Sequence, residues 1–303
     1  MAGLEFNRDF DPRHGEAVRL SPLVRRITAA NPGPFTFHGT NTFLVGNGTV
    51  AVIDPGPDDP DHVAAILKAL EGETVSHILV THTHRDHSPA AAPLQAVTGA
   101  PILAEGPHRP ARPLNIGELN PLDASSDTDF APDRALADGE RITGDGFTFE
   151  AVATPGHTAN HMAFALIEED SLFCGDHVMA WSTSIVAPPD GAMVDYMASL
   201  ERLIARGDRR LYPAHGAPID DPRDFLIGLR EHRIGREAAI LERIAAGDRR
   251  IADMVRVIYA EVDQRLHGAA GLSVLAHIED LVARGRLRTD GVPAIDGDYW
   301  PAG

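Results

Sequence analysis

The chain has 303 residues, of which 43% are hydrophobic and 23% are charged. This composition is typical of a globular protein with a sizeable core, folded as one large domain or two smaller ones. The formal net charge of -17 argues against a partner bound chiefly through phosphates, because such binding depends on clustered Lys and Arg. The single cysteine, Cys174, excludes an intrachain disulfide and Cys-rich zinc modules, so any metal site must use His, Asp or Glu.

The N-terminal residues 1–18 carry early charges and no apolar run, so they do not resemble a signal peptide. No stretch of the sequence approaches the roughly 18 apolar residues that a membrane-spanning helix needs. We therefore expect no membrane association and a cytoplasmic location.

Residues 41–105 predict alternating strands and helices, the rhythm of an α/β protein. The first two strands are separated by Asn47-Gly48, a dipeptide typical of hairpin turns. Apolar periodicity gives the other elements. The expected order is strand 41–47, strand 49–55, helix 62–70, strand 76–82, helix 88–99 and strand 101–105.

Residues 106–135 interrupt this rhythm, because they are rich in Pro, Asp and Ser and show little periodicity. A loop of this length in a compact domain is usually functional or disordered. Arg109 and Arg112, beside His108, either meet an anionic substrate or lie on a solvated loop. After this loop we expect strands at 147–157, 162–168 and 171–176, a helix at 195–206 and a strand within 209–216.

From about residue 222 the pattern becomes helical, with expected helices at 225–247, 251–262 and 272–287. We therefore predict two domains, an α/β domain over residues 1–222 and a helical domain over residues 223–303. The helical part carries about 11 Arg against 13 acidic residues, whereas a domain that binds nucleic acid should be clearly basic. We expect it to support dimerisation or to cover the mouth of an active site.

Potential metal ligands follow four of the expected strands, at the point where each strand turns into a loop. The first group lies in THTHRDH, residues 81–87, after the strand SHILV. Ligand sites in layered α/β folds gather at the carboxyl ends of strands, so four such junctions together are strong evidence for one site. The seven side chains are His82, His84, Asp86, His87, His157, Asp176 and His215.

Seven His and Asp side chains are too many for one zinc ion, which uses three or four protein ligands, but they suit two ions. Two neighbouring metals can lower the pKa of a water molecule and stabilise both the attacking and the leaving oxygen. We therefore predict a site for two divalent metal ions. Zinc is the first expectation, with iron and manganese as alternatives, because His and Asp ligands suit all three.

THTHRDH resembles the H-x-H-x-D-H signature of the metallo-β-lactamase superfamily, and His157, Asp176 and His215 match its remaining metal positions in order. The resemblance covers roughly residues 20–220. It implies an αββα sandwich, two mixed sheets face to face with helices outside. It also implies that one metal is held by His82, His84 and His157, that the second is held by Asp86, His87 and His215, and that Asp176 bridges them.

A narrower resemblance joins four further segments and the helical tail to the beta-lactamase-like protein 2 group. The segments are NPGPFTFHGTNTFLVG (31–46), TPGHTANHMAF (154–164), GDHVMAWSTS (175–184) and DYMASLERL (195–203). Animal members of this group are described as endoribonucleases that act on single-stranded RNA, and the tail resembles a winged-helix module. The match departs at 106–135 and 185–194, so substrate contacts there do not carry over.

The sequence thus predicts a metal-dependent hydrolase that attacks the carbonyl or phosphorus centre of an ester, thioester or phosphodiester. We expect a small-molecule substrate, and we expect Asp86 to orient the attacking water and relay its proton. Two alternatives stay open: an endoribonuclease for single-stranded RNA, and a non-hydrolytic metal-binding or redox protein. A homo-oligomer is a further open alternative.

Other residues near these junctions receive supporting roles. Asp54 ends an expected strand and could hydrogen-bond near the metal ligands. His161 fits a role in supporting a ligand or in the core, and His177 fits packing better than lining the pocket. We expect Cys174 to be a small buried hydrophobic residue. Arg85, inside the histidine motif, receives no role.

Overall fold

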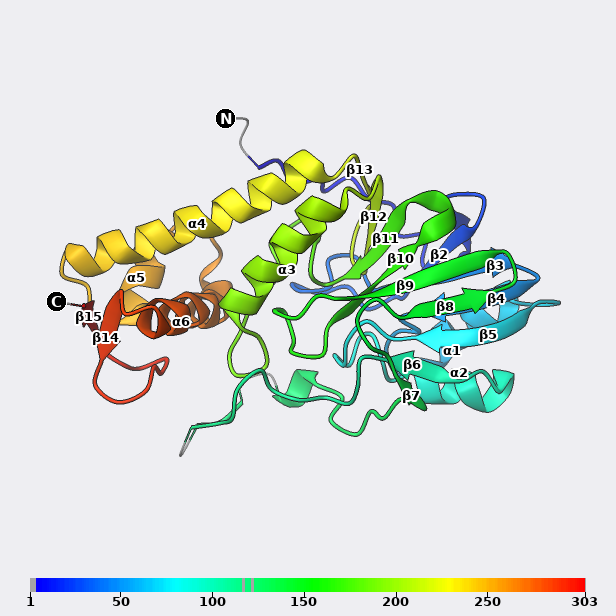
Figure 1. Cartoon of the computed structure of the whole chain (residues 1–303), viewed down its shortest axis with the longest axis horizontal. Helices are drawn as coiled ribbons and strands as arrows, with labels where there is room; N and C mark the ends of the chain where they lie inside the picture. Colours follow the sequence, from blue (N-terminus) through cyan, green and yellow to red (C-terminus); the bar gives the residue numbers. More distant parts are fainter. Residues whose placement is uncertain (1–3, 116–117, 121–122, 303) are drawn as a thin grey trace.

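The computed structural model describes residues 4–115, 118–120 and 123–302 (Figure 1). Two mixed β-sheets lie face to face, and helices cover their outer sides. Strands β1 to β4 of the first sheet are antiparallel to their neighbours, whereas β4 to β7 are parallel. Its described strands, in order across the sheet, are β1 (Val18–Arg19), β2 (Val24–Thr28), β3 (Asn41–Asn47), β4 (Thr49–Ile53), β5 (Thr74–Leu79), β6 (Ile102–Ala104) and β7 (Arg134–Ala135).

The second sheet is antiparallel except for the pair β11 and β12. It follows β7 in the chain and faces the first sheet, because buried side chains of the two sheets pack together. Its described strands, in order across the sheet, are β13 (Ile219–Asp220), β12 (Arg210–Pro213), β11 (Ser171–Gly175), β10 (Met162–Leu166), β9 (Phe147–Ala153) and β8 (Arg141–Gly144).

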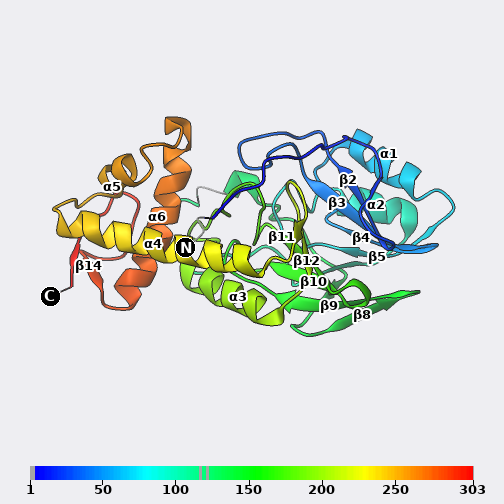
Figure 2. The same ribbon diagram turned by 90° about the horizontal axis from the view of Figure 1, so that it is seen from above.

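Three apolar layers hold the sandwich together. Phe43 and Leu79 of the first sheet pack against Phe149, Phe164 and Phe173 of the second, and all five are buried. Helices α1 (Pro60–Ala69) and α2 (Ala91–Thr98) cover the outer side of the first sheet, and α3 (Met193–Arg206) covers the second (Figure 2). This αββα arrangement is the fold that the sequence predicts.

The hairpin and the strand ends follow from local sequence. Gly48 takes a positive φ of 76° between β3 and β4, as the Asn47-Gly48 turn requires. The strand expected at 147–157 ends at Ala153, because Pro155 and Gly156 turn the chain away. Gly156 has a φ of 141°, and a Cβ atom there would lie 2.3 Å from the Cα of Tyr196, so only glycine fits.

Two further expectations need correction. The helix expected at 88–99 begins at Ala91, because the amide of Ala91 closes a turn onto the carbonyl of Ser88. The loop expected at 106–135 is partly structured, since it contains the 3-10 helix η1 (Asp123–Ser125) and the edge strand β7. Such short elements leave no periodic signal in the sequence.

The C-terminal part contains the three expected helices, α4 (Arg223–Ala245), α5 (Ile251–Ile258) and α6 (His267–Ala283). It also contains a hairpin that the sequence analysis missed, formed by β14 (Leu287–Thr289) and β15 (Tyr299–Pro301). These strands are too short to show alternation. Two 3-10 helices complete the chain, η2 (Ile167–Glu169) after β10 and η3 (Gln264–Leu266) before α6.

Helix α4 packs both against the α3 layer of the sandwich and in the core of the C-terminal helices (Figure 2). Near its start, Leu226 and Leu229 pack with the α3 layer, and near its end Ile240 and Ile244 pack with α5 and α6. The domain boundary after residue 222 therefore stays a prediction. No helix in the described ranges is long and apolar enough to cross a membrane.

Candidate metal centre

All seven side chains predicted as metal ligands meet where β5, β9, β11 and β12 end. Their donor atoms form two compact groups, and within each group these atoms lie within 4.8 Å of one another. The first group is His82, His84, His157 and Asp176, and the second is Asp86, His87 and His215. We refer to the seven residues together as the His/Asp cluster.

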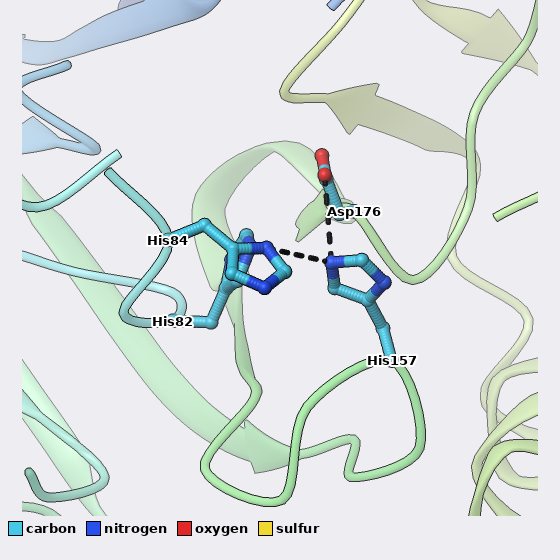
Figure 3. Close-up of side chains that lie close together, drawn as sticks. All are labelled: His82, His84, His157 and Asp176. Carbon is cyan, nitrogen blue, oxygen red and sulfur yellow. Dashed lines mark hydrogen bonds and ion pairs between the residues drawn. The ribbon is translucent and has the colours of Figure 1, made fainter. Parts of the chain in front are cut away.

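In the first group, three imidazoles turn ring nitrogens toward one point (Figure 3). The Nδ1 atom of His84 lies 2.9 Å from Nε2 of His82 and 3.1 Å from Nε2 of His157. Burial, reinforced by the nearby His157, lowers the pKa of His84 to about 3, and burial also lowers the pKa values of His82 and His157. These imidazoles are therefore neutral, which is the form of histidine that binds metals.

Each histidine has one ring nitrogen that points into the cluster and one that points away from it. The hydrogen bonds of the outward nitrogens show which inward nitrogens carry lone pairs. Nδ1 of His82 donates to Oγ1 of Thr81 at 3.0 Å, because that hydroxyl already donates to Asp54. Nδ1 of His157 donates to the carbonyl of Ile185 at 2.6 Å. The Nε2 lone pairs of His82 and His157 thus face the imidazole of His84 at close range, and this arrangement favours a cation between the three rings. On this ground the donor set fits a metal ion.

The second group combines charges of both signs. Oδ2 of Asp86 lies 3.2 Å from Nε2 of His87 and 3.3 Å from Nε2 of His215. The carbonyl of Gly39, 3.2 Å away, accepts from Nδ1 of His215, so Nε2 faces the carboxylates. Burial lowers the pKa of His215, but Asp176 and Asp86 outweigh it and raise that pKa to about 10. The two carboxylates thus attract positive charge to this position.

Asp176 lies between the two groups. Its Oδ2 atom is 3.6 Å from Nε2 of His157 and 3.7 Å from Nε2 of His87, and its Oδ1 atom is 3.2 Å from Nε2 of His215. Burial raises the pKa of Asp176, but His215 and His87 outweigh it, so the group is a carboxylate. This placement agrees with the bridging role that the resemblance implies, and that role stays a proposal.

Asp54 supports the cluster from behind, as expected. Its carboxylate accepts from the amide and the hydroxyl of Thr81, both at 2.8 Å, and from Nδ1 of His87 at 3.0 Å. Its backbone φ of 49° is uncommon for a residue other than glycine. Asp54 thereby fixes the orientation of His87 directly and that of His82 through Thr81.

His161 also supports the cluster, because its Nδ1 donates to Oγ1 of Thr154 at 2.8 Å and its Nε2 accepts from the amide of Asp176 at 3.2 Å. His177 is buried against the ring of Tyr196, and it packs as the sequence favours. Cys174 is fully buried, and burial raises the pKa of its thiol, so it is the inert hydrophobic residue expected.

Arg109 and Arg112 of the 106–135 segment form ion pairs, and neither lines the cavity described below. Arg109 pairs with Glu105, and Arg112 pairs with Glu118 and with Glu279 of α6, both at 2.7 Å. Arg112 therefore ties this segment to the helical domain and is not positioned to meet a substrate.

The His/Asp cluster opens into a cavity of about 600 Å³ with a mostly apolar lining. Phe35 and Trp181 line one part of the cavity, and Arg85, which had no role in the sequence analysis, lines it beside Asp86. Tyr259 and Leu266 of the helical domain line it as well. Of the two roles expected for that domain, covering the mouth of the site agrees with this lining.

Sequence analysis missed three basic residues of α4 that also line the cavity, His232, Arg233 and Arg236. We refer to them as the basic wall. Their spacing of one and then three residues places them on one face of a helix, a signal that the sequence does contain. This signal is weak, because residues 224–303 contain eleven arginines, and the two arginines of the basic wall are among them.

Residues 35–215 match the Metallo-beta-lactamase superfamily, and residues 251–297 match the Beta-lactamase associated winged helix domain. The chain belongs to the metallo-beta-lactamase superfamily and is a hydrolase of that superfamily, with a His/Asp cluster that fits a metal site. The predicted fold, including the winged-helix character of the C-terminal part, is confirmed.

The relatives agree with the narrower resemblance as well. The chain is 32% identical to the Beta-lactamase-like protein 2 homolog of Drosophila melanogaster, over 89% of this chain and 91% of that protein. It is also 32% identical to the atrochrysone carboxyl ACP thioesterase of Aspergillus terreus, over 81% of this chain and 71% of that one. A beta-lactamase domain protein from Burkholderia ambifaria shares the fold, with a TM-score of 0.78 at 21% identity over 97% of this chain and 96% of that chain.

Proposed function

We propose that this chain is a dinuclear-metal-dependent hydrolase that cleaves a small-molecule ester or thioester. The observation that carries the proposal is the position of the His/Asp cluster, at the floor of a mostly apolar cavity of about 600 Å³. Cavities of this size and lining are typical of sites for small molecules. The thioesterase from Aspergillus terreus supports an acyl substrate, and the net charge of -17 disfavours a polyanion.

The residues that would hold the ions are the seven of the His/Asp cluster, with Asp176 shared. Bound divalent ions would supply Lewis acidity and lower the pKa of water, so that attack proceeds at neutral pH. Zinc is the first candidate, with iron or manganese as alternatives. Hydrolysis adds the oxygen of water to the acyl carbon, breaks the C–O or C–S bond, and leaves a carboxylic acid and an alcohol or thiol.

Asp86 is the residue we assign to proton transfer. Its side chain is 25% exposed, more than the 10% of Asp176, and it lines the cavity. The hydroxyl of Thr40 donates to its Oδ2 atom at 3.2 Å and fixes the carboxylate. The Asp86 carboxylate can therefore orient a water in the cavity, accept its proton and pass it to the leaving group or to solvent.

A second candidate function is cleavage of single-stranded RNA. It is favoured by similarity to the Drosophila protein along most of both chains. The cavity also offers aromatic side chains, since Phe35, Trp181 and Tyr259 line it, and bases stack on such side chains. A cytoplasmic location and a homo-oligomer stay predictions under either function.

A substrate panel distinguishes these functions. Purified protein is assayed with a thioester, a lactone, a phosphodiester and a short RNA, before chelation, after chelation, and after divalent metal is returned. We expect thioester or ester turnover that is lost on chelation and restored by metal. RNA cleavage with the same metal dependence would favour the second function, and no turnover of any substrate would favour a non-hydrolytic metal-binding or redox protein.

A further inference from the structure

Apart from Arg223 at the start of the helix, which donates to the carbonyl of Ile204, the arginines of α4 fall into two classes. On the outer face, Arg230 pairs with Glu201 and Glu231, and near the end of the helix Arg243 pairs with Asp248. On the cavity face, Arg233 and Arg236 form no ion pair within the described ranges. A cation removed from water without a counter-charge is costly, so the buried Arg233 and the partly buried Arg236 of this acidic protein need an explanation.

Contacts inside the protein explain Arg233. It is 3% exposed, its guanidinium stacks 4.9 Å from the ring centroid of Tyr196, and its Nη2 donates to the carbonyl of Ser184. The next carbonyl along the chain, that of Ile185, accepts from His157. Arg233 is therefore a positioning residue, which holds the turn that orients one imidazole of the His/Asp cluster.

Contacts inside the protein explain Arg236 only in part. Its guanidinium stacks 4.3 Å from the ring centroid of Tyr259, its Nη1 donates to the carbonyl of Ile258 at 3.0 Å, and its Nη2 lies 3.4 Å from Nε2 of His232. Within the described residues, Nε of Arg236, Nδ1 of His232 and Nε1 of Trp181 are buried atoms without a hydrogen-bond partner, and all three side chains line the cavity. Burial lowers the pKa of His232 to about 4, so this imidazole is neutral and can donate.

We propose that Arg236 and His232 bind an anionic group of the substrate, while its ester or thioester bond lies at the His/Asp cluster. This inference rests on the proposed hydrolase function and adds the substrate class: an acyl ester or thioester with an apolar body and a terminal carboxylate or phosphate. The cavity has a cationic side chain and part of the His/Asp cluster in one mostly apolar lining, which selects such a molecule. The anion comes either from the acyl chain or from the leaving group.

The test uses three thioesters that differ in one group. Hexanoyl-N-acetylcysteamine is neutral, adipoyl-N-acetylcysteamine carries a carboxylate on the acyl chain, and hexanoyl-phosphopantetheine carries a phosphate on the thiol side. Each is assayed with the wild type, Arg236→Gln and Arg236→Lys. Arg230→Gln is the matched control, because it makes the same chemical change on the paired, outer face of the same helix.

We expect one anionic thioester to exceed the neutral one in kcat/KM. Arg236→Gln should lower kcat/KM for that substrate about 10- to 100-fold, chiefly through KM, because one charge-assisted hydrogen-bond donor is lost. Turnover of the neutral thioester should fall much less than that of the anionic one, Arg236→Lys should keep most of the preference, and Arg230→Gln should behave as the wild type. A preference that survives Arg236→Gln, or no preference in the wild type, overturns the inference. If Arg236→Gln does not fold, His232→Gln makes the same comparison.

A binding measurement separates this inference from the hydrolase function. Adipate and inorganic phosphate are titrated calorimetrically into the metal-loaded wild type, Arg236→Gln and Arg230→Gln. Binding at least tenfold weaker in Arg236→Gln alone supports the anion site even if no thioester is hydrolysed. Equal binding in all three proteins overturns it. Binding of a short RNA that depends on Arg236, with neither small anion bound, overturns the small-molecule assignment.

Discussion

The His/Asp cluster and the basic wall face the same cavity but are built in opposite ways. In the His/Asp cluster the outward nitrogens of His82, His87 and His157 are each held by a protein oxygen, so the inward atoms are fixed. In the basic wall, Arg236 and His232 keep donors without partners inside the protein. The comparison sets a cluster of oriented donors against a wall with unpaired donors, for which we propose a partner from the substrate. The predictions below test the two halves of this contrast.

The largest effect should come from the inward-facing nitrogens. His84→Ala removes the nitrogen on which His82 and His157 converge, so metal affinity and hydrolysis should both fall by more than about 100-fold, the upper effect of losing a supporting residue. Metal content after dialysis and kcat/KM measure this. Full activity with two ions bound in the His84→Ala variant would show that His84 is not a metal ligand.

The next largest effect should come from the oxygen atoms that accept hydrogen bonds on the outer side of the imidazoles. Asp54→Asn should weaken metal binding by about 10- to 100-fold, because the acceptor of His87 and Thr81 is altered. Asp170→Asn is the matched control, since Asp170 also has a positive φ, 47° against 49°, but lies exposed in a turn. Similar metal affinities in the two variants would contradict the role of Asp54.

Within the basic wall, unfolding experiments should separate the two arginines. Arg233→Met leaves the buried carbonyl of Ser184 without its donor, so the free energy of unfolding should fall by about 1–3 kcal/mol. Arg236→Met should cost less, because Arg236 and its acceptor at Ile258 are partly exposed and water can replace the bond. Urea denaturation of both variants measures the difference, and a larger loss for Arg236→Met would reverse their roles.

The smallest effect should come from the two ion pairs of Arg112, one with Glu118 in the same segment and one with Glu279 of α6. Arg112→Gln should lower stability by less than about 1 kcal/mol, because its partners are partly exposed. Arg112 holds the pKa of Glu118 below 4.5, so the stabilisation from that pair is present above about pH 4.5 and is lost as the pH falls through the lowered pKa. Urea denaturation of wild type and variant at pH 7 and pH 3.5 should give converging stabilities at the lower pH.

The same contrast explains what could be predicted from the sequence. Histidines and aspartates follow four strand ends, so the composition of the His/Asp cluster could be predicted from the sequence pattern, whereas the αββα fold was implied by the resemblance to the superfamily. The seven residues meet because the strands that precede them align in two facing sheets. Asp54 was found for the same reason, since it ends a strand beside the cluster.

The basic wall leaves no such pattern. Whether Arg236 faces a carboxylate, as Arg230 does, or a cavity depends on where α4 lies relative to the His/Asp cluster, which is a tertiary contact. The β14–β15 hairpin was missed for a related reason, because its three-residue strands are stabilised by packing of Leu287 and Tyr299 on α5 and α6 rather than by alternation. Tertiary packing decides such features more than local propensity does.

The stoichiometry of bound metal tests the central claim most directly. Wild-type protein is saturated with zinc, iron or manganese, passed through a desalting column and analysed by mass spectrometry for metal per chain. The account predicts two divalent ions per chain in the wild type, because the seven donor residues form two groups and Asp176 lies between them. One ion or none per chain with every metal tested would contradict it.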